Sequence, residues 1–148
     1  MKAVHIIFIT LTALCSMSSM LSAQDLEKHL WNHRVIILYT PDSTLSHYQN
    51  QLTEFRKVDH DLGERKIALY QVIDQSYMYT DFKKNTSQRF PWLPLDQKNL
   101  KIKDRSTTSL TLIGLDGGIK LQTQRLVKRK ELFDIIDSMP MRRAELNR

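Results

Sequence analysis

Cysteine is almost absent from this 148-residue sequence, since Cys15 is the only one. It lies within the first 23 residues, which have the pattern of a secretory signal peptide. Lys2 supplies the positive start, an apolar run extends from Ala3 to Leu14, and the small residues Ser22 and Ala23 precede the expected cleavage point. The rest of the chain has no cysteine at all. In an exported protein this absence excludes disulfides, thiolate nucleophiles and cysteine-based metal sites.

Long hydrophobic runs are also scarce. The apolar run near the N-terminus is too short and wrongly flanked for a transmembrane helix. We therefore expect a periplasmic or secreted protein that does not span a membrane once it is mature. Residues 24–148 are long enough for one domain with a hydrophobic core, and they contain no internal repeat and no low-complexity segment.

Acidic residues are fewer than basic ones, 16 against 22. Lys2 is the one charged residue among the first 23, so the net charge of the remainder falls from +6 to +5. A basic exported protein can meet an anionic partner such as a glycan, a lipid headgroup or an acidic protein. A solvated basic surface that maintains solubility explains the same charge. Specific nucleic-acid binding is not expected, because no known motif appears and export removes the usual target.

The first half of the mature chain predicts a strand–helix–strand unit. Residues 35–39 are apolar on both faces and rich in β-branched side chains, as in a central strand that is covered on both sides. Apolar residues then recur at three- and four-residue steps from Leu45 to Leu62, which predicts one long helix with Ser43 or Thr44 as its N-cap. Residues 67–73 predict a second strand, so the unit is βαβ with a right-handed crossover.

The flanking segments complete the predicted architecture. A short amphipathic helix is expected at 25–31, whereas 74–108 has no regular pattern and predicts an irregular, functional or mobile segment. Two apolar runs around Asp116-Gly117-Gly118 predict a hairpin, and a closing helix at 128–139 should end at Pro140 before a basic tail. The predicted fold class is therefore α/β: thioredoxin-like, with a mixed four-stranded sheet and helices on both faces.

Three motifs of the sequence resemble one protein family. They are Trp31-x-x-Arg34, then Leu112-Ile113-Gly114-x-Asp116-Gly117-Gly118-x-Lys120-Leu121, and finally Leu132-Phe133-x-x-Ile136-Asp137-x-Met139-Pro140-Met141-Arg142. They are similar to a family of small secreted bacterial proteins catalogued as a domain of unknown function. Related domains occur in animal extracellular-matrix proteins, some of which carry sushi repeats. The resemblance implies a thioredoxin-like or peroxiredoxin-like fold outside the cytoplasm, with no agreed activity.

The same resemblance indicates where the redox residues of those folds would lie, and here none of them is a cysteine. Thr40-Pro41-Asp42-Ser43 resembles the peroxiredoxin turn, with Ser43 at the position of the peroxidatic cysteine. Against thioredoxins, Ser43 and Ser46 occupy the two cysteine positions, and Thr108 falls at the cis-proline position. A serine hydroxyl is too weak an acid for thiol exchange or peroxide reduction. A catalytic Ser43 would need a base such as His47, whereas helix capping explains this serine without further assumptions.

Basic side chains and histidines supply the remaining candidates. The basic set near the closing helix consists of Lys120, Arg125, Lys128, Arg129, Arg142 and Arg143. It could dock an anionic partner in a salt-dependent way, or it could be a solvated face with a cationic tail. His29 and His33 are four residues apart, but no third ligand stands at a motif spacing. We therefore expect surface histidines, no metal and no cofactor.

These observations leave two classes of function open. The first is an exported non-catalytic binding or structural module on a thioredoxin-like scaffold, which docks an anionic partner through a basic C-terminal face. The alternative is an enzyme with thiol-independent chemistry, in a pocket formed by Thr40 to Ser43 and the loop near Thr108. A cysteine-free partner of a redox protein is a third possibility.

The first hypothesis predicts that Ser43→Ala leaves function intact, because it assigns no chemistry to that hydroxyl. Charge reversal at Arg125, Lys128 and Arg129 should weaken binding, since it removes the attraction for an anionic partner. The measurement is retention of partners from periplasmic extract at low and at high salt. Unchanged retention after the charge reversal would count against the basic face.

Overall fold

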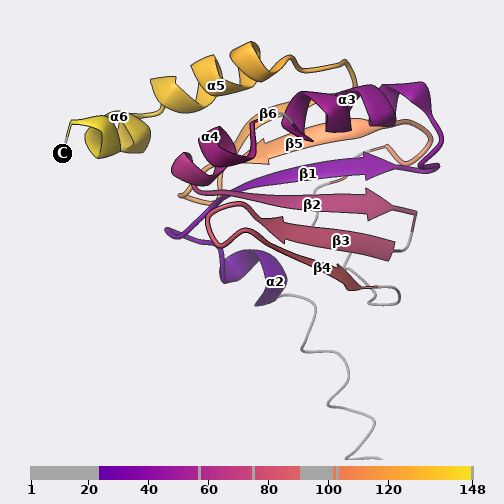
Figure 1. Cartoon of the computed structure of the whole chain (residues 1–148), viewed down its shortest axis with the longest axis horizontal. Helices are drawn as coiled ribbons and strands as arrows, with labels where there is room; N and C mark the ends of the chain where they lie inside the picture. The colour runs from indigo at the N-terminus through magenta and orange to yellow at the C-terminus, as the bar shows by residue number, and fades with distance from the viewer. Residues whose placement is uncertain (1–23, 57, 75, 91–101, 103, 148) are drawn as a thin grey trace, which may run out of the picture.

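The computed structural model describes residues 24–56, 58–74, 76–90, 102 and 104–147, which build one six-stranded sheet with helices packed against it (Figure 1). The strands are β1 (Arg34–Thr40), β2 (Ile67–Ile73), β3 (Ser76–Asp81), β4 (Thr86–Phe90), β5 (Ser109–Ile113) and β6 (Ile119–Thr123). The helices are α2 (Gln24–Glu27), α3 (Ser46–Arg56), α4 (Asp59–Glu64), α5 (Arg129–Ser138) and α6 (Pro140–Leu146). The expected signal peptide lies outside the described residues. Within them, no helix combines the length and the apolar character needed to cross a membrane.

The strand β1 lies at the centre of the sheet, which has the order β4-β3-β2-β1-β5-β6. It pairs in parallel with β2, in the register Ile36 with Leu69, and antiparallel with β5, in the register Ile36 with Leu112. Every residue of β1 is buried, because the strand is covered on both faces. The sequence prediction of a central strand is confirmed here.

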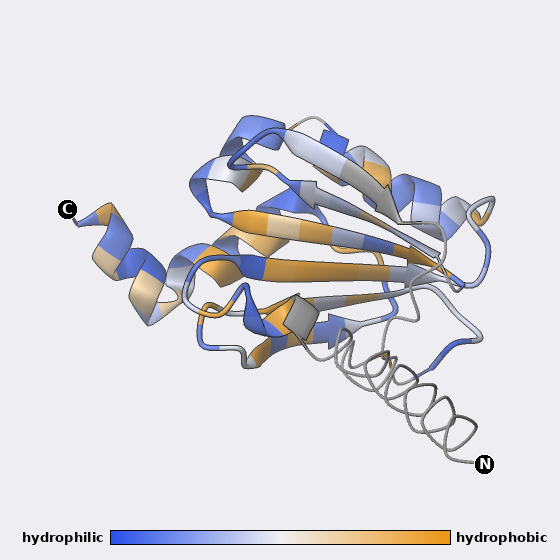
Figure 2. Ribbon diagram, turned by 90° about the horizontal axis from the view of Figure 1, so that it is seen from below, coloured by the Kyte–Doolittle hydropathy of each residue, from blue (hydrophilic) through white to orange (hydrophobic). Residues whose placement is uncertain are grey.

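Two hydrophobic clusters divide the side chains of β1 between the faces of the sheet. Ile36 and Leu38 belong to the larger cluster, which includes the buried residues of α3, α4 and α5. Val35, Ile37 and Tyr39 belong to the smaller one, against which α2 packs. Figure 1 shows α3, α4 and α5 above the sheet and α2 below it. In Figure 2 the most hydrophobic colours follow the central strands, as expected for a strand buried on both sides.

The sheet has six strands, so the expected number of four is wrong. The two extra strands, β3 and β4, form an antiparallel hairpin within the segment 74–108 that was expected to be irregular. The residues of β3 between Met78 and Thr80 are half-buried, and β4 lies at the edge of the sheet, so neither strand needs a continuous apolar pattern. Within the segment 74–108, residues 91–101 and 103 lie outside the described residues.

The helix expected from Leu45 to Leu62 is two helices, α3 and α4. The expected cap at Ser43 or Thr44 is also wrong, because the first residue of α3 is Ser46. Asp42 closes the preceding turn instead, since its carboxylate accepts hydrogen bonds from the backbone N–H (2.8 Å) and the hydroxyl (2.9 Å) of Thr44. At the other end of the chain, the expected basic tail is helical. Pro140 occupies the first turn of α6, where a proline is tolerated.

Truncation of Leu132 tests whether α5 belongs to the cooperative core. Leu132 is fully buried in the larger cluster, so Leu132→Ala should lower the free energy of unfolding by about 2–5 kcal/mol. Leu146→Ala on α6 is the control, because this side chain is 58% exposed and the loss should stay within about 0.5 kcal/mol. Urea unfolding followed by circular dichroism measures both. Equal small losses would show that α5 is not part of the core.

Candidate functional site

The threonines at the expected redox positions meet inside the protein. Thr40 ends β1 and Thr108 precedes β5, and their hydroxyl oxygens lie 3.0 Å apart with both residues buried. The two hydroxyls therefore contact each other on one side of the place where the enzyme hypothesis expects a pocket. Ser46 is exposed, and Ser43 lies beside a separate hollow of about 370 Å³ between α3, β2 and β3. No hydrogen bond joins Ser43 to His47 in the described part of the chain.

The basic set near the closing helix is largely neutralised by acidic neighbours. Lys120 pairs with Asp116 (2.7 Å), Arg125 pairs with Glu131, and Lys128 pairs with Glu54 (3.1 Å). Arg129 and Arg143 have exposed side chains.

Arg142 departs most from the expected cationic tail, because it is only 8% exposed. Its guanidinium donates hydrogen bonds to the carboxylate of Asp137 (3.2 Å) and to the backbone carbonyl of Glu64 (3.1 Å). The six basic residues therefore do not form one open cationic surface.

The three family-like motifs converge at the end of the sheet where β1 begins. The first motif runs from the turn after α2 into β1, the second is the β5–β6 hairpin, and the third joins α5 to α6. Trp31 donates its backbone N–H to the carbonyl of Leu115 (2.8 Å), which fastens the first motif to the second. Trp31 has a left-handed backbone (φ 64°) and a largely exposed ring. A bulky residue rarely adopts this conformation, so the surrounding contacts must impose it.

Arg34 is the most unusual side chain at this end of the molecule. It is fully buried, and its Nη1 donates to the backbone carbonyl of Arg65 (2.9 Å) and to the carboxylate of Glu145 (3.3 Å). Its Nε and Nη2, which form one edge of the guanidinium, have no hydrogen-bond partner among the described residues. Burial lowers the pKa of Arg34, and the nearby Glu145 opposes that shift, but a guanidinium stays protonated in proteins. The site therefore contains a buried positive charge with an unsatisfied donor edge.

Arg34 belongs to an ion-pair cluster in which four cations share two carboxylates. The cluster consists of Arg34, Arg65, Lys66, Arg142, Asp137 and Glu145. Glu145 accepts from three of the cations, at 2.9 Å from Lys66, 3.3 Å from Arg34 and 3.4 Å from Arg142. Asp137 accepts from the other cation, Arg65, at 2.6 Å, and also from Arg142. With every member ionised, the cluster keeps a formal surplus of positive charge.

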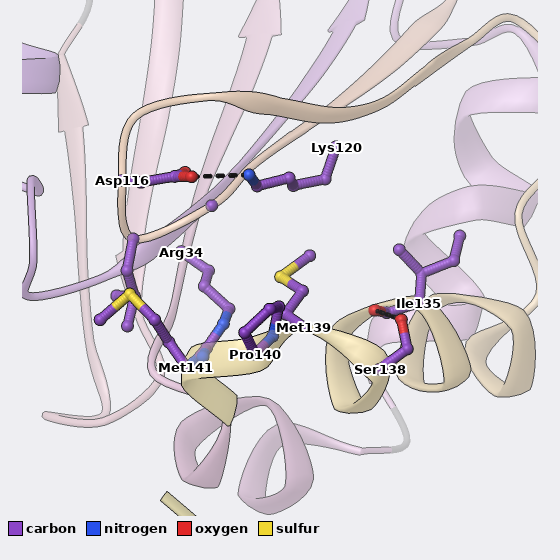
Figure 3. Close-up of a pocket in the computed structure, with 10 residues that line it drawn as sticks. Arg34, Asp116, Lys120, Ile135, Ser138, Met139, Pro140 and Met141 are labelled. Carbon is purple, nitrogen blue, oxygen red and sulfur yellow. Dashed lines mark hydrogen bonds and ion pairs between the residues drawn. The ribbon is translucent and has the colours of Figure 1, made fainter. Parts of the chain in front are cut away.

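A pocket of about 480 Å³ lies directly against this cluster (Figure 3). It is lined by Arg34, Gly114, Leu115, Asp116, Lys120, Ile135, Ser138, Met139, Pro140 and Met141, and we call it the motif pocket because each of the three motifs contributes to it. Figure 3 shows the Asp116–Lys120 ion pair on one side, the end of α5 and the start of α6 on the other, and Arg34 between them. Arg34 lines the motif pocket although its side chain, including Nε and Nη2, is buried, whereas Met141 is 40% exposed.

The hairpin wall of the motif pocket depends on Gly117, whose φ of +75° is unfavourable for other residues. Asp116 holds the turn by accepting the backbone N–H of Gly118 (3.0 Å). The hydrogen bond from Lys120, followed by that from Gly118, lowers the pKa of Asp116. Asp116 and Lys120 therefore face the pocket as a closed ion pair.

Two histidines that were expected on the surface form a buried chain with a tyrosine and an aspartate. His29 contacts the Tyr70 hydroxyl (2.8 Å) through Nε2 and the His33 ring (3.1 Å) through Nδ1. His33 in turn lies 3.6 Å from Asp81. Burial lowers the pKa of His33, although Asp81 acts in the opposite direction. The i, i+4 spacing was visible in the sequence, but the long-range partners were not.

One group of described residues brings three potential metal ligands within 4.8 Å of one another, namely His60, Asp61 and Glu64. They lie on the short helix α4, where His60 and Glu64 are exposed. Acidic surface groups of this kind are common without a metal, so the geometry does not assign one.

The family model described as Domain of unknown function (DUF4174) matches residues 25–145. This agrees with the resemblance to a family catalogued in that way. No curated protein and no solved structure matches the chain.

The ion-pair cluster predicts a dependence of stability on pH. Burial alone would raise the pKa of Glu145, but the hydrogen bond from Lys66 and the charge of Arg34 outweigh it and lower the pKa. Burial would also raise the pKa of Asp137, but the hydrogen bonds from Arg65 and Arg142 outweigh it and lower the pKa. Carboxylates with lowered folded-state pKa values stabilise the fold above their unfolded-state values, near pH ~4. That stabilisation is lost as the pH falls through the folded-state values.

We therefore expect Glu145→Gln to lower the free energy of unfolding by about 1–3 kcal/mol at pH 7, because buried cations lose a shared acceptor. The difference from the wild type should narrow as the pH falls below about 4 and through the lowered folded-state pKa of Glu145, because the wild-type carboxylate is then itself protonated. Asp134→Asn is the control, since Asp134 forms only an exposed pair with Lys130 on α5. Urea unfolding across the pH range measures all three proteins. A constant difference at every pH would contradict the assignment.

Proposed function

The chain belongs to this family of domains of unknown function, and we propose that it is an exported, non-catalytic binding module that holds an anionic group in the motif pocket. The scaffold that we propose is thioredoxin-like. The order β2-β1-β5-β6 supports this, with β1 parallel to β2 and β5 antiparallel to β1. The connection of β1 to β2 through α3 and α4, and the closing helix α5 after the β5–β6 hairpin, support it as well.

The observation that carries the proposal is the unsatisfied edge of Arg34. Leaving a buried donor without a partner costs about 1–3 kcal/mol, and more when the donor is charged. Such a cost is tolerated where a ligand supplies the missing acceptor. Because the cluster around Arg34 has more cations than carboxylates, the ligand that satisfies this edge should be an anion.

We therefore propose that the anion binds in the motif pocket and not at the basic face that was expected from the sequence. Arg125 and Lys128 already have acidic partners at the surface, so an external anion would compete with Glu131 and Glu54 for them. Exposed ion pairs contribute little and are screened by salt. An anion at Arg34 would instead be bound in a desolvated place, where hydrogen bonds to a charged group are stronger.

The residues that line the motif pocket favour binding over catalysis. They include no histidine and no cysteine. Its one hydroxyl, on Ser138, donates to the carbonyl of Ile135 (2.7 Å), and its carboxylate, on Asp116, is paired with Lys120. No lining group is therefore placed as a nucleophile with an adjacent base.

Thermal unfolding in a panel of anions tests the proposed function. Acetate, phosphate and sulfate are compared at constant ionic strength, and at least one should raise the Tm of the wild type, because a ligand that binds only the folded state stabilises it. At about a hundred times its dissociation constant a ligand adds about 2.7 kcal/mol. Arg34→Met should abolish this rise, since it removes the donor edge but keeps much of the side-chain volume.

Arg143→Met is the matched control, because it removes the same charge from an exposed position on α6. It should keep the anion-dependent rise in Tm. If Arg34→Met does not fold, Ser138→Phe replaces it, since this change fills the motif pocket and leaves Arg34 in place. The proposed function is wrong if no anion distinguishes the wild type from these pocket variants.

A further inference from the structure

The unpaired edge of the Arg34 guanidinium has a geometry that favours one chemical class of ligand. Nε and Nη2 of a guanidinium point in parallel from one edge, at a spacing that matches the two oxygens of a planar carboxylate. In Arg34 this is the edge without a partner, while Nη1 is already occupied by Arg65 and Glu145. The free edge is therefore the bidentate one.

Three further polar groups of the motif pocket are already engaged. Lys120 is bonded to Asp116, the Ser138 hydroxyl donates to Ile135, and the backbone N–H of Gly114 donates to Gly118 (2.8 Å). A phosphate or sulfate would need donors for its further charged oxygens, and the engaged groups do not offer them. The Asp116 carboxylate would in addition repel a dianion. A carboxylate needs only the two donors of Arg34, and as a monoanion it is repelled less by Asp116 than a dianion would be.

The walls around this edge are mainly apolar. Ile135, Met139, Pro140 and Met141 come from α5 and α6, and Leu115 comes from the turn after β5. Proline has no N–H to offer, and unbranched methionine side chains adapt to the shape of an apolar ligand. Met141 is 40% exposed, and the proposal below requires its side chain to move aside for a ligand to reach the buried guanidinium.

We propose that the motif pocket binds a carboxylate attached to an apolar body, with the carboxylate on Nε and Nη2 of Arg34 and the body against the methionines of α5 and α6. This inference rests on the proposed function, and it narrows the anion to one chemical class. The apolar body would displace water from Ile135 and Met139, while the carboxylate would neutralise part of the positive surplus of the ion-pair cluster.

The test uses ¹⁵N-labelled protein and follows the Nε–Hε signal of Arg34, which is assigned by its disappearance in Arg34→Lys. Hexanoate, hexanamide and inorganic phosphate are titrated separately. We expect hexanoate to shift the Arg34 signal and to bind about tenfold or more tightly than the other two, because hexanamide lacks the charge and phosphate the apolar body. Ser138→Phe and Arg34→Lys should each weaken hexanoate binding by about tenfold or more, while Arg143→Lys should leave it unchanged.

The possible outcomes separate this inference from the proposed function. If phosphate shifts the Arg34 signal at least as well as hexanoate does, the carboxylate inference is overturned and the anion-binding function stands. If hexanoate binds equally to the wild type and to Ser138→Phe, it binds elsewhere, and the inference is again overturned. If no anion shifts the Arg34 signal or raises the Tm, both proposals fail.

A further titration distinguishes two sources of the carboxylate, the terminus of a peptide chain and a small organic acid. N-acetyl-leucine carries the terminal carboxylate of a peptide, and its amide is the matched neutral control. Tighter binding of N-acetyl-leucine than of hexanoate supports the proposal with a chain terminus as the ligand, and the reverse order supports it with a small organic acid. Equal binding of N-acetyl-leucine and its amide would contradict a role for the carboxylate.

Discussion

Two carboxylates hold the motif end of the molecule together. Glu145 on α6 and Asp137 on α5 accept hydrogen bonds from cations that belong to β1, to the turn between α4 and β2, and to α6 itself. The helix α6 buries little apolar surface, since Met141 and Leu146 are exposed, so these charged contacts determine where it lies. Because Pro140 and Met141 form one wall of the motif pocket, the shape of the pocket depends on the same contacts.

The elements that the sequence predicted well are those whose patterns are local. The strands β1 and β2 are continuous apolar runs, the β5–β6 hairpin is marked by Asp116-Gly117-Gly118, and α5 has a helical apolar period. The hairpin of β3 and β4 could not be predicted in this way. It is an edge hairpin of aromatic and polar residues, and its stability comes from pairing with β2 rather than from its own pattern.

The candidate site was harder to predict because its signal lies in pairings between distant residues. Arg142 appears in the sequence as one of several basic residues near the C-terminus, yet it is buried against Asp137 and Glu64. Arg34 is a single cation before an apolar strand, and nothing in the sequence shows that one edge of its guanidinium lacks an acceptor. A net positive charge indicates that cations are in excess, but the unpaired ones can be located only from the folded chain. The three motifs do meet at one end of the molecule, because all of them contribute to the motif pocket.

The opposite end of β1 differs from the motif end in how its polar groups are paired. Thr40 and Thr108 lie where the resemblance to thioredoxin-like proteins would place redox residues, and their hydroxyls contact each other there. Six residue steps along β1 separate Thr40 from Arg34, which corresponds to roughly 20 Å. At the Thr40 end the two hydroxyls pair with each other. The motif end instead has a buried guanidinium with an unpaired donor edge, an adjoining pocket and a surplus of cations. A polar group left unmatched in an otherwise well-packed protein requires an explanation, and a bound anion provides one that also accounts for the positive surplus around it.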